Sequence, residues 1–235
     1  MQEEKLWTPE FIGMSGSNLL LFMSQYIMVA ALPIFIMETL GGGEVEAGMA
    51  MTAFQVGAVT CRPLAGKLID AVQKQRLLLL ASLAFLLIML AFCFAHALGA
   101  IYALRLLHGC IFALATTAAA AMAALVLPPA RKGEGIGYFA LSTNLAMVAG
   151  PLVGLLIIGH LGSRALFLFL TGLAALTLLA AGARRLPRAV TAPAPQRKRG
   201  FSLTDFIEPR SLAPSLLGGL VFFAYGGILT FIPLY

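Results

Sequence analysis

The chain has 235 residues, of which 60% are apolar and only 11% are charged. A soluble protein of this length cannot bury so much apolar surface, so the composition excludes a soluble domain and indicates a protein surrounded by lipid. The formal net charge is +6, but the basic residues lie in short segments between apolar runs. This pattern is typical of topology signals and excludes a nucleic-acid-binding surface.

Seven apolar runs are long enough to cross a bilayer, which takes about 20 helical residues. In chain order they are Phe11–Met37, Ala47–Ile69, Leu77–Leu98, Ile101–Leu127, Gly135–Ile158, Ala165–Ala183 and Leu212–Tyr235. We therefore predict an all-α polytopic membrane protein. Residues 1–10 include Glu3, Glu4 and Glu10 and lack the pattern of a cleavable signal peptide, so the first run is predicted to stay in the membrane.

Basic residues follow the even-numbered runs. Examples are Lys74 and Arg76 after the second run and Arg131 and Lys132 after the fourth. In the loops on the opposite side, Arg164 is the only lysine or arginine. By the positive-inside rule, the N-terminus and the even-numbered loops are predicted to be cytoplasmic, in a bacterial-type inner (plasma) membrane.

The chain is predicted to have four segments: a cytoplasmic N-terminus (1–10), a six-helix bundle (11–183), a cytoplasmic linker (184–211) and a seventh helix (212–235). The linker is rich in Pro, Ala and Arg, and its residues Ser202 to Ile207 are predicted to form a short amphipathic helix on the membrane surface. The seventh run resembles the first, as if a second bundle were beginning. We therefore expect a fragment or truncated product whose C-terminal bundle is missing.

A short repeat supports this division. Pro63-Leu64-Ala65-Gly66 in the second run matches Pro151-Leu152-Val153-Gly154 in the fifth. The second and the fifth run cross the membrane in opposite directions, so the match predicts inverted three-helix repeats.

The segment after the second run combines a small residue with a carboxylate. Gly66 and Asp70 are four residues apart, share a helix face and are followed by Lys74 and Arg76. A small residue lets a neighbouring helix approach, and the carboxylate can meet its dipole or a basic partner. We predict a gate latch here, with an ordinary charged helix end as the alternative. Arg62 is predicted either to pair with Asp70 or to extend towards the cytoplasm.

Arg105 is a charged residue inside the fourth run, with Gly109 one helical turn further on. A charge costs about 2.5 to 3.5 kcal/mol at the centre of a membrane helix, so such residues usually face a cavity or a partner. Gly109 and the small residues between Ala118 and Ala124 predict a closely packed interior helix. We predict a functional role for Arg105; in the alternative, its side chain reaches the outer interface.

The fifth run contains Gly150, Pro151 and Gly154 in close succession. Glycine and proline weaken the backbone hydrogen-bond ladder, which permits a kinked and tightly packed helix. We predict a hinge that also seals against ion leak. The alternative is generic packing of small residues.

In chain order, these three segments resemble signatures of the major facilitator superfamily, the last of them its antiporter signature. The first match is partial, since Ala71 and Gln73 stand where a basic residue and a glycine are usual. The resemblance implies the N-terminal six-helix bundle of that fold plus helix 7, and transport by alternating access between two bundles. It also implies that Arg105 and Gly109 couple transport to substrate or protons.

Several polar residues lie at mid-membrane depth in the first, second and fifth runs. They are Asn18, Gln25, Tyr26, Gln55 and Asn144. We predict that they line a substrate cavity, with interhelical hydrogen bonds of about 1 kcal/mol or less as the alternative for each.

No Asp or Glu lies in the middle of any predicted span. A proton-coupled transporter usually needs a titratable buried group. We therefore expect the carboxylate in the missing half; in the alternatives, Asp70 or Glu38 serves, or transport is not driven by protons. Cys61, Cys93 and Cys110 lie inside apolar runs without metal-type spacing, and we expect no disulfide, metal or other cofactor. Neither a nucleotide-binding loop nor a nucleophile with a base is present, so an enzyme is not predicted.

The preferred hypothesis is a secondary active transporter that exports a small molecule, a drug or metabolite, in exchange for protons. Its expected partners are that substrate, protons and the lipid bilayer. Two alternatives remain: an importer of sugars or organic anions on the same fold, and a seven-helix membrane protein that does not transport. The fifth-run signature disfavours the importer, and the restarted repeat disfavours the seven-helix protein.

Overall fold

The computed structural model describes residues 5–182 and 211–221, apart from the side chain of Asp70. Five helices follow one another in the first range: α1 (Pro9–Thr39), α2 (Glu44–Ala71), α3 (Lys74–Phe92), α4 (Leu98–Val126) and α5 (Lys132–Gly182). A 3-10 turn, Pro129–Arg131, precedes α5. A separate helix covers Ser211–Val221, in a second unit that comprises Arg197–Tyr235.

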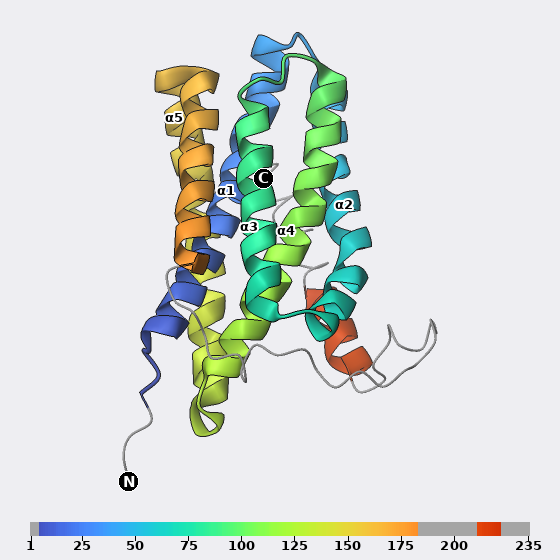
Figure 1. The fold of residues 1–235 in the computed structure, drawn as a ribbon. Coiled ribbons are helices and arrows are strands. Elements are labelled where there is room, and N and C mark those ends of the chain that lie inside the picture. Colours follow the sequence, from blue (N-terminus) through green and yellow to red (C-terminus); the bar gives the residue numbers. More distant parts are fainter. Residues whose placement is uncertain (1–4, 183–210, 222–235) are drawn as a thin grey trace. The chain divides into compact units, whose positions relative to one another are not determined.

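The helices of the first unit run alternately up and down, so that each connection lies at one of the two ends (Figure 1). Helix α5 doubles back at Gly162, whose φ of 79° and ψ of 177° are not helical. Its two limbs, residues 132–161 and 163–182, correspond to the fifth and sixth predicted spans. The described part of the chain therefore contains the predicted six-helix bundle.

Local signals explain where the first two helices begin. The Thr8 hydroxyl accepts a hydrogen bond from the Phe11 N–H at 3.2 Å, and Pro9 stands at the first helical position. At the start of α2, a Glu46 carboxylate oxygen accepts a hydrogen bond from the Gly43 N–H at 2.8 Å. Backbone N–H groups of Glu46 itself and of Gly43 lower the pKa of this carboxyl, so the cap persists at neutral pH and is lost on acidification.

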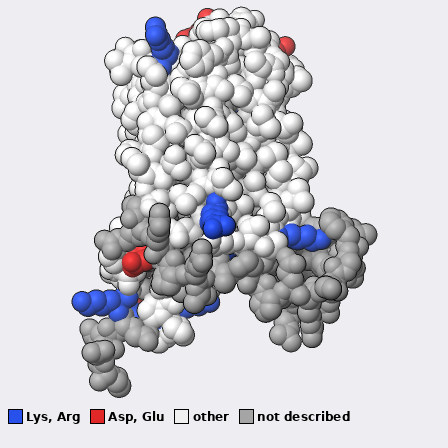
Figure 2. All heavy atoms as spheres, in the orientation of Figure 1, with Lys and Arg blue, Asp and Glu red and all other residues white. Residues whose placement is uncertain are grey.

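Four of the described helical segments are long and apolar enough to cross a membrane: Pro9–Thr39, Lys74–Phe92, Leu98–Val126 and Pro129–Gly182. Helix α2 matches the second predicted span but is less apolar. On the face drawn in Figure 2, uncharged side chains cover the middle and most Lys and Arg side chains lie towards one end. The chain is thus a multi-pass membrane protein with an uneven distribution of basic residues.

The end of α3 differs from its predicted position, and most of the region predicted after the sixth span lies outside the described residues. The third span was predicted to end at Leu98, but α3 ends at Phe92 and residues 93–97 form a turn before α4. This turn consists largely of apolar residues, which hydropathy cannot distinguish from a membrane helix. The predicted linker helix and most of the seventh span lie outside the described residues; only Ser211–Val221 of that region is described.

The core has two layers of buried side chains between the helices. One contains Phe35, Phe85, Phe92 and Phe112, and the other contains Phe11 and Met122 near the N-terminal end of α1. In the first layer, the rings of Phe92 and Phe167 stack at 5.7 Å, which ties α3 to the second limb of α5. Aromatic contacts therefore join helices that are distant in sequence.

The backbone at Gly162 gives a first prediction. A φ of 79° with ψ near 180° is accessible essentially to glycine alone, so Gly162→Ala should lower the free energy of unfolding by about 1–3 kcal/mol. Gly159→Ala is the matched control, because Gly159 is helical and an added Cβ would meet nothing within 4 Å. Thermal unfolding in detergent, followed by a thiol-reactive dye on the three free cysteines, measures both. Equal stability of the two variants would contradict the prediction.

Candidate functional site

A pocket of about 390 Å³ lies between α1, α2 and α4. Aromatic and aliphatic side chains make most of its wall, and four polar side chains interrupt it. Its lining consists of Phe22, Gln25, Tyr26, Val29, Met51, Phe54, Gln55, Ala58, Arg62, Arg105 and Phe112. These lining residues include two arginines and no acidic side chain. The pocket is therefore suited to an apolar or amphipathic molecule and disfavours cations.

Arg105 lies at the base of this pocket and is fully buried. Its Nε donates to the Ala50 carbonyl at 3.3 Å, and Nη1 donates to Gln25 Oε1 at 3.3 Å. The guanidinium also lies over the Phe54 ring, 4.5 Å from its centroid. The alternative that Arg105 reaches the outer interface is wrong, because its partners on α1 and α2 hold it inside the bundle.

A guanidinium buried in this way normally pairs with a carboxylate. The described residues place no carboxylate beside Arg105, and carbonyl dipoles, an amide and an aromatic face take that role instead. The charge is thus solvated by neutral groups, and it remains attractive to a ligand oxygen that enters the pocket.

His108 is the residue that sequence analysis missed. It is fully buried, and its Nδ1 lies 3.2 Å from Arg105 Nη1. Four phenylalanine rings surround it: Phe54, Phe85, Phe92 and Phe112. A histidine inside an apolar run, three residues after an intramembrane arginine, was a signal available in the sequence.

Glycines determine how closely α4 approaches α2. A Cβ added at Gly109 would collide with the Phe54 carbonyl, and one added at Gly57 would collide with the Leu106 carbonyl. The two backbones therefore touch at this crossing, as the small residues of the fourth run predicted. The approach also places Ala50 within reach of Arg105, so Gly109 acts on the site through packing.

The second close crossing joins α1 to the first limb of α5. A Cβ at Gly150 would lie 2.6 Å from the Tyr26 Cβ, and one at Gly154 would lie 2.9 Å from the Ile27 carbonyl oxygen. Helical geometry continues through Pro151, since Gly162 is the residue of α5 with non-helical angles. The structure therefore shows the tight packing predicted for this segment; its role as a hinge stays a prediction.

The polar residues predicted to line a cavity fall into two groups. Gln25, Tyr26 and Gln55 line the pocket. Asn18 is buried elsewhere and donates hydrogen bonds to Ser142 Oγ at 2.8 Å and Thr143 Oγ1 at 2.9 Å, which joins α1 to α5. Asn144 is exposed and does not line the pocket. For Asn18 the interhelical alternative holds in this structure.

The predicted gate residues lie at the end of α2 and the start of α3. Among the described residues none approaches Gly66, where an added Cβ would meet nothing within 4 Å. The side chain of Asp70 lies outside the described residues, so its pairing with Arg62 is not described either. Lys74 takes part in a polar contact, and Arg76 is exposed. Arg62 is exposed and lines the pocket beside Arg105.

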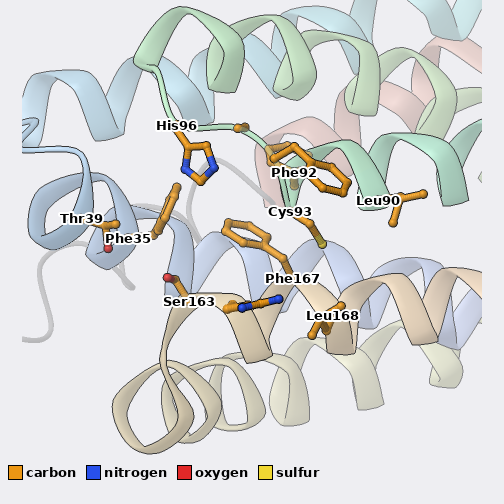
Figure 3. A pocket seen from close by; sticks show the side chains of 12 residues that line it. Phe35, Thr39, Leu90, Phe92, Cys93, His96, Ser163, Phe167 and Leu168 are labelled. Carbon is orange, nitrogen blue, oxygen red and sulfur yellow. The ribbon is translucent and has the colours of Figure 1, made fainter.

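A second pocket, of about 410 Å³, lies at the opposite end from the N-terminus, between α1, α3 and the second limb of α5 (Figure 3). The rings of Phe35, Phe92 and Phe167 contribute to its lining, and His96 and Ser163 lie on opposite sides of these rings in the view of Figure 3. Neither Arg105 nor His108 lines this pocket. We therefore assign the first pocket, which is lined by Arg105 and is named the central pocket, as the candidate site.

Comparison with known proteins identifies relatives. The family model described as Major Facilitator Superfamily matches residues 14–235. Two proteins named multi-drug resistance efflux pump PmrA, from Streptococcus pneumoniae serotype 4 (strain TIGR4) and strain R6, are each 30% identical over 155 residues. That match covers 64% of this chain and 38% of each relative.

Solved structures show the same fold. A crystal structure of a peptide transporter POT mutant in complex with alafosfalin superposes with a TM-score of 0.69 at 20% identity, covering 95% of this chain and 48% of that one. The mutant in complex with sulfate gives a TM-score of 0.66 at 17% identity, with coverages of 94% and 46%. The chain thus spans about half the length of these transporters.

The glycine crossing gives a second prediction. Gly109→Ala should cost about 1–3 kcal/mol of unfolding free energy, because its Cβ would collide with the Phe54 carbonyl and force α2 and α4 apart. Gly48→Ala is the control on α2, where an added Cβ meets nothing within 4 Å. Thermal unfolding in detergent compares them. Full stability of Gly109→Ala would mean that α2 and α4 do not touch in the membrane.

Proposed function

This chain belongs to the major facilitator superfamily, and from that premise we propose that it works in proton-coupled export of a small drug-like or metabolite molecule by alternating access. The observation that carries the proposal is the central pocket, in which Arg105 is buried beneath an aromatic wall without an acidic partner among the described residues. The efflux pumps among the relatives support export over import.

Alternating access needs two bundles, and the described residues form one. We infer that the central pocket is one wall of a cavity whose other wall is a C-terminal bundle, since the comparable peptide transporters are about twice as long. The buried partners of Arg105 on α1 and α2 would change when the bundles rock. Substrate contacts at Arg105 and Gln25 would then respond to that motion.

The chemistry of the pocket favours uncharged amphipathic substrates. Phe22, Tyr26 and Phe54 offer apolar surface, and Gln25 and Gln55 offer hydrogen bonds to carbonyl or hydroxyl groups. Arg62 and Arg105 repel cations and are not offset by an acid among the lining residues. A neutral drug fits these features better than a lipophilic cation.

The ends of the bundle are assigned on the same basis. The basic residues at the end that holds the N-terminus support the proposal that this end is cytoplasmic, in a bacterial-type inner membrane. Gly66, Asp70, Lys74 and Arg76 lie at this end and are proposed to latch the cytoplasmic gate. Gly150, Pro151 and Gly154 are proposed to act as the hinge of the antiporter signature.

An importer on the same fold is the second candidate, since the fold is shared with peptide transporters. These neighbours are at most 20% identical to the chain, so they support the shared fold rather than a shared substrate. The direction of transport separates the two candidates.

A third prediction tests the proposal in everted membrane vesicles energised to an acidic interior. Neutral chloramphenicol should dissipate the proton gradient in vesicles with the whole protein, and ethidium, a cation, should do so less. Arg105→Ala should reduce the response about tenfold or more, because its truncation removes a buried charge and frees Gln25. Arg164→Ala, at an exposed position outside the central pocket, is the control.

Alafosfalin serves as the probe for the importer. Uptake driven by external acid in right-side-out vesicles, without a response to chloramphenicol in everted ones, would replace export by import. If the proton gradient is lost equally in wild type and Arg105→Ala, Arg105 takes no part in transport.

A further inference from the structure

His108 is a titratable group buried in the bundle, and the proposed function does not give it a role in transport. Its ring is fully buried, and its Nε2 has no hydrogen-bond partner among the described residues. Buried polar atoms are nearly always hydrogen-bonded, so a buried ring nitrogen without a partner is unusual and indicates a role other than packing. The predicted spans contain no Asp or Glu, so His108 is the side chain at this depth whose ordinary pKa lies nearest to neutrality.

The contact with Arg105 determines the protonation state of His108 in this structure. A guanidinium has only donors, so Arg105 Nη1 donates and His108 Nδ1 accepts across 3.2 Å. The lone pair of Nδ1 is therefore free of a proton, and the ring is neutral with its proton on the orphaned Nε2. The described conformation is the deprotonated state of the pair.

In the part of the chain that the structure describes, the surroundings of the ring contain one charged group. Phe54 faces it from α2, Phe85 and Phe92 face it from α3, and Phe112 and Arg105 face it from its own helix. Among the described residues, Arg105 is thus the charge that senses the protonation of His108. Four phenylalanine rings make up the remaining ring contacts of His108.

We propose that His108 is the proton-binding residue of this bundle and that its protonation drives the Arg105 side chain out of its buried position into the central pocket. This inference rests on the proposed proton-coupled export. A proton from water in the cavity binds the Nδ1 lone pair, the ring becomes an imidazolium, and the hydrogen bond from Arg105 breaks. Two cations then stand 3.2 Å apart, so the guanidinium, which keeps its own proton, moves away.

The direction of that movement follows from the pocket. Arg105 already reaches the pocket wall through Gln25, and Met51 and Phe54 flank the same side. A guanidinium that enters the pocket occupies volume and brings water, which displaces an apolar substrate. Proton and substrate therefore compete for one pocket, and such competition is what exchange of one for the other requires.

The protonation of His108 is tested directly by nitrogen NMR of ¹⁵N-histidine-labelled protein in nanodiscs. The variant His96→Gln/His160→Gln leaves His108 as the sole histidine and changes two exposed side chains. We expect the Nε2-protonated neutral ring at alkaline pH and protonation of Nδ1 when the pH is lowered into the acidic range. A ring that stays neutral throughout, or one with its proton on Nδ1, overturns the proposal.

Coupling is tested with His108→Gln, whose amide oxygen can accept from Arg105 but cannot bind a proton. Binding of radiolabelled chloramphenicol to the whole protein should weaken about tenfold or more between pH 8 and 5.5 in wild type and stay constant in the variant. His160→Gln is the control and should keep the wild-type dependence. A variant that retains this dependence overturns the role of His108.

The outcomes separate the inference from the proposed function. Wild-type transport that is proton-coupled, together with a pH-independent His108, leaves export intact and excludes His108 as the carrier. Titration of His108 without any chloramphenicol, ethidium or alafosfalin response removes the proposed function and with it the coupling. If His108→Gln fails to fold, the sole-histidine titration still decides whether His108 binds the proton.

Discussion

The rest of this bundle depends on direct contact between helix backbones at glycine residues. Lipid provides no hydrophobic driving force between membrane helices, so their association relies on close packing and on polar contacts. Gly57 and Gly109 provide that packing between α2 and α4, and Gly150 and Gly154 provide it between α1 and α5. The two crossings are equivalent under the predicted inverted repeat, which relates the first span to the fourth and the second to the fifth.

The α2 and α4 crossing also creates the site. It brings the Ala50 carbonyl to Arg105 and the Phe54 ring to both Arg105 and His108. Because α1 contributes Gln25 to the same cluster, three helices meet at one guanidinium. A single change in the charge of this cluster therefore reaches all three helices, which is the property that a coupling site needs.

The sequence predicted the helices and much of the packing, because hydropathy and small-residue patterns are local properties. The six spans, the tight crossings at Gly109, Gly150 and Gly154, and the interior position of Arg105 follow from such patterns. The hydrogen bonds of Asn18 did not, because they depend on which faces of distant helices meet, and a single sequence does not specify those faces. The turn at residues 93–97 was missed because its residues are apolar. The contact of His108 with Arg105 joins residues three apart on one helix, so it was available from their spacing.

The backbone contact at Gly109 also bears on how the substrate range can change during evolution. Positions at a crossing tolerate no added atom, whereas Val29 and Gln55 line the same pocket with exposed side chains that no crossing uses. Substitutions at those two positions alter the size and polarity of the pocket without separating any pair of helices. In the proposed exporter, new substrates can therefore be acquired on α1 and α2 while the charged cluster of α4 stays unchanged.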